Sequence, residues 1–273
     1  MKLKALTIAL FLGAGLMKAN AQTGPYLGVT TSYNSTWVLD QKLMDDQNYD
    51  TQNTWDDSPI GFTLGYKVNP SSSIQVEINK NTMGAEFDIL GSQIYDGEKR
   101  VIGEKNIETK YWSVPVLYKF TSGEKVRFNF HVGPQFSFLS EGSEVNEFTE
   151  TGILKITASG TDITVADAAS HPNTTTADLE ILGKSALYQS GENDVRAGKE
   201  DFNKTDIGAL VGLGLEADIV SNLYISANFR VYYGFKDIRS DARVAEAEAR
   251  GYYDSRTNAT AGFQIGLHYR FDL

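Results

Sequence analysis

The sequence of 273 residues contains no cysteine, which excludes a disulfide framework and a thiol-linked lipid anchor. Beyond the N-terminal region it has no long apolar run, and its mean hydropathy is −0.30. Membrane-spanning helices are therefore excluded, although β-strands that cross a membrane are not. Histidine occurs only at positions 131, 171 and 268, which limits the candidates for acid–base chemistry.

The N-terminus has the pattern of a secretory signal peptide. A basic start at residues 1–4 precedes apolar residues 5–17 and the small-residue sequence Ala-Asn-Ala at 19–21. This apolar stretch is shorter than the ~20 residues that a membrane-spanning helix needs. We therefore predict an exported protein with a signal peptide over 1–21 and one mature domain over 22–273.

The signal peptide holds three lysines and no acidic residue, so the mature chain keeps 22 basic and 35 acidic residues, a net charge of −13. Such an acidic chain argues against nucleic acid as a partner. Six aspartates lie in one stretch, and their spacing does not match an EF-hand calcium loop. They suit a solvated surface or, alternatively, divalent-cation bridging to lipopolysaccharide. These aspartates are Asp40, Asp45, Asp46, Asp50, Asp56 and Asp57.

Eight segments of the mature chain alternate apolar with polar or small residues. This period of two is typical of a strand that faces an apolar medium on one side and a polar one on the other. The clearest segment is 126–138, the weakest is 26–39, and the segment from Ile74 fades towards Phe87. The eight segments are 26–39, 60–68, 74–87, 111–120, 126–138, 206–216, 223–235 and 263–273.

The connections between these segments alternate in length. Tight turns at 69–72, 121–124 and 220–222 alternate with polar stretches at 40–59, 90–107, 140–205 and 236–257. Outer-membrane barrels have an even number of strands, short periplasmic turns and long extracellular loops. We therefore predict an all-β fold, an eight-stranded antiparallel transmembrane β-barrel with four long extracellular loops. A soluble lipocalin-like barrel would need a charged outer face in place of the apolar one.

Aromatic residues near both ends of the predicted strands support this interpretation, since aromatic side chains favour the membrane–water boundary. Those near the short turns are Tyr66, Tyr118, Phe120, Tyr269 and Phe271. Those near the long loops are Tyr33, Trp37, Trp112, Phe138, Tyr233 and Phe235.

The chain resembles the PorT-like outer-membrane β-barrel family of Gram-negative bacteria from about residue 24 to the end, apart from the loop 140–205. The resemblance implies an integral protein of the outer membrane and carries no catalytic residues. Some members of that family assist type IX secretion, so a secretion-accessory role is one expectation. The matching stretches are 111–120 (YWSVPVLYKF), 131–134 (HVGP), 206–216 (DIGALVGLGLE), 229–238 (FRVYYGFKDI) and 269–271 (YRF).

Charged and histidine side chains occupy polar positions of the predicted strands, which face the lumen. An eight-stranded barrel has room only for side chains in its lumen, and buried charges persist when they are paired. We therefore expect a filled lumen, with a narrow polar conduit as the alternative. The predicted lumen network consists of Lys67, Glu77, Lys119, Arg127, His131, Glu216, Arg230, His268 and Arg270.

The long loops are the expected functional part of the protein, because structured loops longer than a connection requires commonly carry function. In the 140–205 loop, residues 153–157 and 163–165 have strand composition and 178–187 has helix composition. In the last loop, residues 240–250 predict either a capped helix or a solvated loop.

We expect a non-enzymatic envelope component whose extracellular loops bind an unknown protein or surface ligand. We predict no catalytic, metal-binding or cofactor-binding residue. The expected partners are outer-membrane lipid and lipopolysaccharide, and the barrel assembly machinery that inserts such proteins. The alternatives are a small channel and, less favoured, a lipid-modifying enzyme, for which the histidines at 131 and 268 point into the lumen and the one at 171 lies in a loop.

Overall fold

The computed structural model describes residues 23–90, 101–148, 153–156, 161–164, 193–249 and 253–271. The predicted signal peptide at 1–21 lies outside the described residues. The helix predicted at 178–187 and His171 lie outside them as well.

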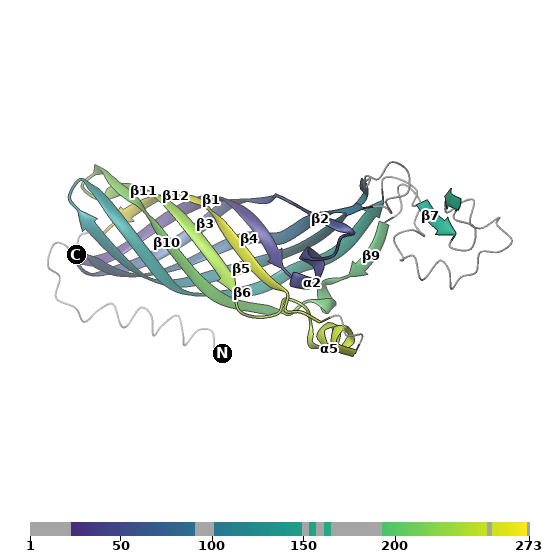
Figure 1. Ribbon diagram of the computed structural model, residues 1–273. Helices are drawn as coiled ribbons and strands as arrows, with labels where there is room; N and C mark the ends of the chain where they lie inside the picture. Colours follow the sequence, from purple (N-terminus) through teal and green to yellow (C-terminus); the bar gives the residue numbers. More distant parts are fainter. Residues whose placement is uncertain are drawn as a thin grey trace.

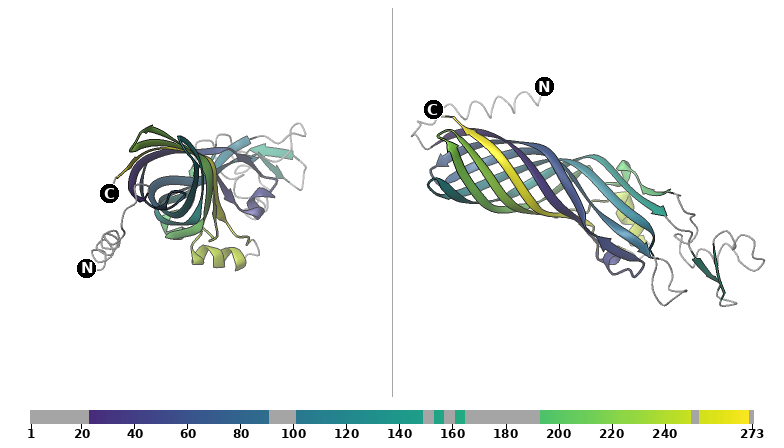
Figure 2. Two further views of the ribbon diagram at one scale, coloured as in Figure 1. Left: turned by 90° about the vertical axis from the view of Figure 1, so that its left-hand side faces the viewer. Right: turned by 90° about the horizontal axis from the view of Figure 1, so that it is seen from above.

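Eight antiparallel strands form a closed ring, as the alternation predicts (Figures 1 and 2). Each strand pairs with the next along the chain, pairing between β6 and β10 joins the middle strands, and pairing between β1 and β12 completes the ring. The strands are β1 (Gly24–Leu39), β3 (Thr54–Asn69), β4 (Ser72–Leu90), β5 (Val101–Gly123), β6 (Val126–Phe148), β10 (Thr205–Val220), β11 (Leu223–Gly234) and β12 (Thr257–Arg270). Among the described residues, no helix is long and apolar enough to cross a membrane.

The two ends of the ring differ in their connections. At one end, residues 70–71, 124–125 and 221–222 link successive strands, and both the start of β1 and the end of β12 lie at this end (Figure 1). We call this the short-turn end. The opposite, long-loop end carries every long connection.

In the part of the barrel nearer the short-turn end, apolar side chains face outwards and polar side chains fill the lumen. In β11, for example, Ile225, Phe229 and Val231 are exposed, whereas Ser226 and Asn228 are buried. The lumen is so crowded that Gly65 cannot carry a larger side chain. A Cβ atom there would lie 2.0 Å from the ring of Tyr26.

Three strands extend well past the rest of the ring at the long-loop end. The sequence predicts loops at 90–107 and from 140 onwards, but β5 already begins at Val101 and β6 continues to Phe148. A β-bulge at Ser140 of β6 interrupts the register, because Lys110 pairs with Glu141 whereas Tyr111 pairs with Leu139. The extra residue exchanges the inward and outward positions of β6. This reversal breaks the sequence pattern from which the strand was predicted.

The smaller elements lie towards the long-loop end of the molecule (Figure 1). Strand β2 (Tyr49–Gln52) pairs with β4, and β9 (Asn193–Ala197) pairs with β6. Strands β7 (Ile153–Ile156) and β8 (Thr161–Thr164) form a separate two-stranded sheet. The remaining elements are helices α2 (Gln41–Met44), η3 (Lys199–Asp201, a 3₁₀ turn) and α5 (Asp241–Ala249). Helix α5 resolves the choice between helix and loop for 240–250.

Candidate functional site: the filled lumen and the outer cap

The centre of the lumen contains a buried ion pair between Glu77 of β4 and Arg230 of β11. The guanidinium donates two hydrogen bonds to the carboxylate, at 2.8 and 2.6 Å. The amide groups of Asn79 and Gln264 donate to the same carboxylate, at 3.0 and 3.2 Å. Glu77 is completely inaccessible to solvent. Its charge is therefore compensated from several strands at once, as a buried charge requires.

A second ionic group lies nearer the short-turn end. Glu216 contacts both Lys119 and Arg127, and Arg127 donates hydrogen bonds of 2.6 and 2.8 Å to Asp218. Arg270 lies 2.9 Å from the same Asp218 carboxylate. The guanidinium of Arg270 also lies 4.2 Å from the ring centre of Tyr224, in a cation–π contact.

The two histidines of the lumen are buried and form hydrogen bonds with neutral polar groups. Nδ1 of His131 is 3.1 Å from the side-chain oxygen of Asn129, and Nε2 of His268 is 2.8 Å from the hydroxyl of Ser226. Neither side chain reaches the lipid-facing surface, as the alternation predicts. Neither forms an ion pair with a carboxylate among the described residues.

The structure thus brings eight of the nine predicted lumen residues into ion pairs, hydrogen bonds or ring contacts. The remaining one, Lys67, is half-buried in a cavity at the short-turn end that Arg127 and Arg270 also line. The sequence prediction missed Asp218 because it lies near the end of its strand. It also missed the amide groups, since Asn and Gln do not stand out among the polar residues of an alternating strand.

The lumen contains a small cavity beside its central ion pair. A cavity of about 30 Å³ lies beside Arg230 and Tyr232. That volume is about the share of a single water molecule in the liquid.

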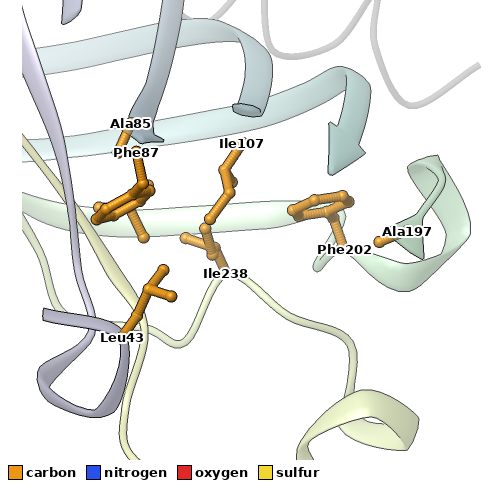
Figure 3. Close-up of a cluster of buried hydrophobic side chains, with 8 residues drawn as sticks. Leu43, Ala85, Phe87, Ile107, Ala197, Phe202 and Ile238 are labelled. Atoms are coloured by element: carbon orange, nitrogen blue, oxygen red, sulfur yellow. The ribbon is translucent and has the colours of Figure 1, made fainter. Parts of the chain in front are cut away.

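At the long-loop end, an apolar cluster packs between the extended strands and the neighbouring loops (Figure 3). Phe87 of β4, Ile107 of β5 and Ile238 of the β11–β12 connection are each about 1% exposed. Leu43 of α2 and Phe202 after η3 pack against them from the surrounding loops. We call this cluster, with Val38, Ala85 and Ala197, the outer cap.

A buried ionic chain accompanies the outer cap. Arg256 donates a 2.9 Å hydrogen bond to Asp40 and a 2.7 Å hydrogen bond to Glu144, which also contacts Lys105. Burial disfavours the charged form of Glu144, but the charges of Lys105 and Arg256 outweigh it and hold the pKa of the carboxyl at about 2. These four residues come from four distant segments, so spacing in the sequence gives no sign that they meet.

The outward face of the extended strands is acidic. Asp50, Asp88, Glu104 and Glu147 stand directly opposite one another across β2, β4, β5 and β6. Burial and the neighbouring charges of Glu104, Asp88 and Glu147 raise the pKa of Glu86 beside this row. Of the six aspartates predicted on a solvated surface, only Asp50 belongs to this row, and Asp40 lies in the buried ionic chain. Among the described residues, no group of three or more carboxylate, histidine or cysteine side chains has the arrangement of a metal site.

Aromatic side chains surround the barrel at both predicted boundaries. Tyr33, Trp112 and Tyr233 are exposed near the long-loop end, and Tyr118 and Tyr269 are exposed near the short-turn end. Trp55, which the sequence prediction did not include, stacks on Tyr33 with ring centres 5.0 Å apart. Trp37, in contrast, is half-buried.

A closed antiparallel ring with an apolar outer surface, a polar filled lumen and aromatic boundaries defines an integral β-barrel membrane protein. The chain belongs to the family of the outer membrane protein β-barrel domain, whose model matches residues 20–240. It is an integral protein of the outer membrane of Gram-negative bacteria. The short-turn end then corresponds to the periplasmic side and the long-loop end to the outer side.

Solved outer-membrane barrels are similar to the chain at low identity. Neisserial surface protein A is 9% identical with a TM-score of 0.40, covering 91% of this chain and 99% of its own. OprG of Pseudomonas aeruginosa is 7% identical with a TM-score of 0.40, at 93% and 99% coverage. Ail, the attachment invasion locus protein of Yersinia pestis, is 14% identical with a TM-score of 0.35, at 90% and 99% coverage. No curated protein sequence matches the chain.

Proposed function

We propose that the protein is a non-enzymatic envelope component whose barrel is a closed anchor and whose outer end binds a protein or surface ligand. The observation that carries the proposal is the outer cap. It fixes the extended strands and loops into one packed body outside the membrane, whereas the lumen beneath is filled with paired side chains. A packed body of this kind provides a preorganised binding surface.

The test removes residues 165–192, which lie outside the described part of the chain, and leaves the residues of the outer cap in place. Full-length protein and a variant lacking 165–192 are compared in intact cells by crosslinking to surface and culture components. Both should show the heat-dependent shift in gel migration of a folded barrel. We expect the full-length protein to capture a specific component and the shortened variant to lose it. Capture by neither protein would contradict the proposal, and equal capture by both would assign the binding to the outer cap and not to residues 165–192.

The resemblance to PorT-like proteins makes a secretion-accessory role a specific form of this proposal. Deletion of the gene should then reduce the amount of secreted cargo, and the shortened variant should fail to restore it. Normal secretion in the deletion strain would exclude that role and leave the binding proposal standing. Contacts with lipopolysaccharide and with the barrel assembly machinery belong to the same proposal.

A small channel is the second candidate, favoured by the polar character of the lumen. Conduction requires a continuous water path past Arg127 and Arg230, whereas the ion pairs of both residues obstruct it. We therefore expect no stable conductance in planar bilayers. The lipid-modifying alternative predicts that His131→Ala or His268→Ala abolishes an activity without unfolding the barrel, and we expect neither change to alter the phenotype.

A further inference from the structure

A cleft of about 330 Å³ lies at the long-loop end of the molecule. It adjoins the outer cap, because Ala197 and Phe202 of that cluster line it. It lies between helix α5, the segment around η3 and the outer ends of β6 and β12, so separate loops build it together. Its volume is at the lower end of the range for small-molecule sites, about 300–1,000 Å³.

Two arginines in the wall are held by carboxylates, and each has one nitrogen that bonds no described residue. Arg256 uses Nε and Nη1 to bind Asp40 and Glu144, and its Nη2 makes no hydrogen bond to any described residue. Arg239 uses Nε and Nη2 to bind Asp237, and its Nη1 is likewise unbonded within the described part of the chain. The side chains of Arg239 and Arg256 are 12% and 11% exposed, so neither is sealed from solvent. Both arginines are therefore preorganised donors at the cleft.

The rim of the cleft presents acceptors as well as a donor. Arg243 of α5 donates a 3.0 Å hydrogen bond to Glu246, and its Nε lies 3.9 Å from Asp201. Arg243 also donates a 3.3 Å hydrogen bond to the backbone carbonyl of Arg196, and the Asp201 carboxylate accepts one of 2.9 Å from the backbone N–H of Gly198. The three side chains are between 32 and 42% exposed, so their polar groups remain accessible at the rim.

The balance of charge decides the class of ligand. The lining combines three guanidinium groups with three carboxylates, those of Asp201, Glu246 and Glu144, and so has no net charge. The carboxylates of Asp40 and Asp237, which hold Arg256 and Arg239, lie directly behind the lining, so a small anion gains no net attraction there. A neutral polyhydroxyl molecule gains from both, since each hydroxyl can accept from a guanidinium and donate to a carboxylate.

We propose that this cleft binds a neutral saccharide unit of a surface glycan. The inference rests on the proposed function, an outer end that binds a partner or ligand, and it specifies the ligand of one site at that end. Arg239, Arg243 and Arg256 donate hydrogen bonds to the hydroxyl oxygens of the saccharide. Asp201 and Glu246 accept hydrogen bonds from its hydroxyl groups.

The test measures direct binding to the full-length protein in micelles of a detergent without a sugar headgroup. The probes are the methyl glycosides of glucose, galactose and mannose. Their binding is measured by ligand-observed NMR and by calorimetry. Glucuronate, inorganic phosphate and glycine serve as charged and zwitterionic comparators. We expect at least one neutral glycoside to bind more tightly than every comparator.

A matched pair of substitutions on one helix locates the site. Ala247 lines the cleft, whereas Ala245, two residues away, is exposed outside it. We expect Ala247→Trp to fill the cleft and weaken glycoside binding at least tenfold, and Ala245→Trp to leave it unchanged. Both variants should retain the heat-dependent gel shift. Equal binding by the two tryptophan variants would overturn the assignment.

A second pair tests the charge balance. Glu246→Gln keeps the size of the side chain but leaves the lining with one excess positive charge, and Glu248→Gln changes an exposed residue of the same helix that does not line the cleft. We expect only Glu246→Gln to shift preference towards glucuronate by several-fold. Absence of neutral glycoside binding by the wild type, or tighter binding of phosphate, glucuronate or glycine, would refute the ligand class. Partner capture that depends on 165–192 would remain valid in that case, which separates the two proposals.

Discussion

The membrane-embedded and outer parts of the barrel have opposite distributions of polarity along the same strands. In the half of β4 nearer the short-turn end, Gln75 and Glu77 face inwards and Ile78 faces outwards. In the half nearer the long-loop end, Phe87 faces inwards and Asp88 faces outwards. Inward positions keep the same parity throughout β4, so the strand does not rotate.

The medium around the strand explains this inversion. In the bilayer the outward side chains meet lipid, and polar groups satisfy one another in the lumen. Beyond the aromatic boundary the outward side chains meet water, and apolar side chains gain by packing inside. Each half therefore places its apolar residues where its own surroundings favour them.

The largest expected effect concerns the polar interior of the membrane part. Glu77→Ala should destabilise the barrel by about 3–5 kcal/mol, because the charge of Arg230 would be left buried without its partner. Urea-induced unfolding in detergent micelles would measure this change. Glu108→Ala removes a carboxylate from the outward face of the outer part and should alter the unfolding midpoint little. Similar losses in both variants would mean that the lumen pair carries no special role.

The second effect concerns the outward face in the bilayer. Leu213→Arg or Val132→Arg should impair membrane insertion, at a cost of about 2–4 kcal/mol for a charge near the midplane. Gln135→Arg, whose side chain faces the lumen, should be milder. Asn106→Arg, on the outward face of the outer part, should insert normally. The folded fraction on heat-modifiability gels reports each outcome, and equal tolerance at all four positions would contradict the assigned faces.

The sequence was sufficient to predict the barrel because the bilayer imposes one simple pattern on each spanning strand. Segment 126–138 shows that pattern throughout and lies within β6. The prediction of loops at 90–107 and 140–205 was less accurate, because the polarity inverts near Asn81 and Tyr111 and the bulge at Ser140 shifts the parity.

The outer ionic chain was beyond prediction for a different reason. Asp40, Lys105, Glu144 and Arg256 each lie in or beside a predicted loop, and only the packing of the outer cap brings them together. In the lumen, by contrast, strand parity alone selects the side chains that meet, although it does not give their partners.

A change in pH should have a smaller effect on the stability of the outer part. The sign of this effect should differ between Glu144 on the inward face and Glu86 on the outward face. The pKa of Glu144 is held below its ordinary value of 4.5, so its contribution to stability is present above that pH and is lost as the pH falls towards about 2. The pKa of Glu86 is raised, so protonation on acidification should relieve repulsion and favour the folded state. Denaturant midpoints between pH 7 and 3 would show this. Relative to wild type, Glu144→Gln should lose less stability on acidification, and Glu86→Gln should lose more. A common pH profile for all three proteins would contradict both assignments.

The smallest effect concerns the row of carboxylates on the outward face of the outer part. Glu104 stands between Asp88 and Glu147, and like charges directly opposite each other destabilise a sheet whereas opposite charges stabilise it by about 0.2–1 kcal/mol per pair. Glu104→Lys should therefore stabilise the protein by up to about 1 kcal/mol at low salt, and Glu104→Gln by roughly half as much. Because the Debye length falls to about 3 Å in 1 M salt, the gain should largely disappear there. A gain that persists at high salt would instead indicate a change in strand propensity or packing. Loss of stability at low salt would mean that the carboxylate row is compensated by a bound cation or partner.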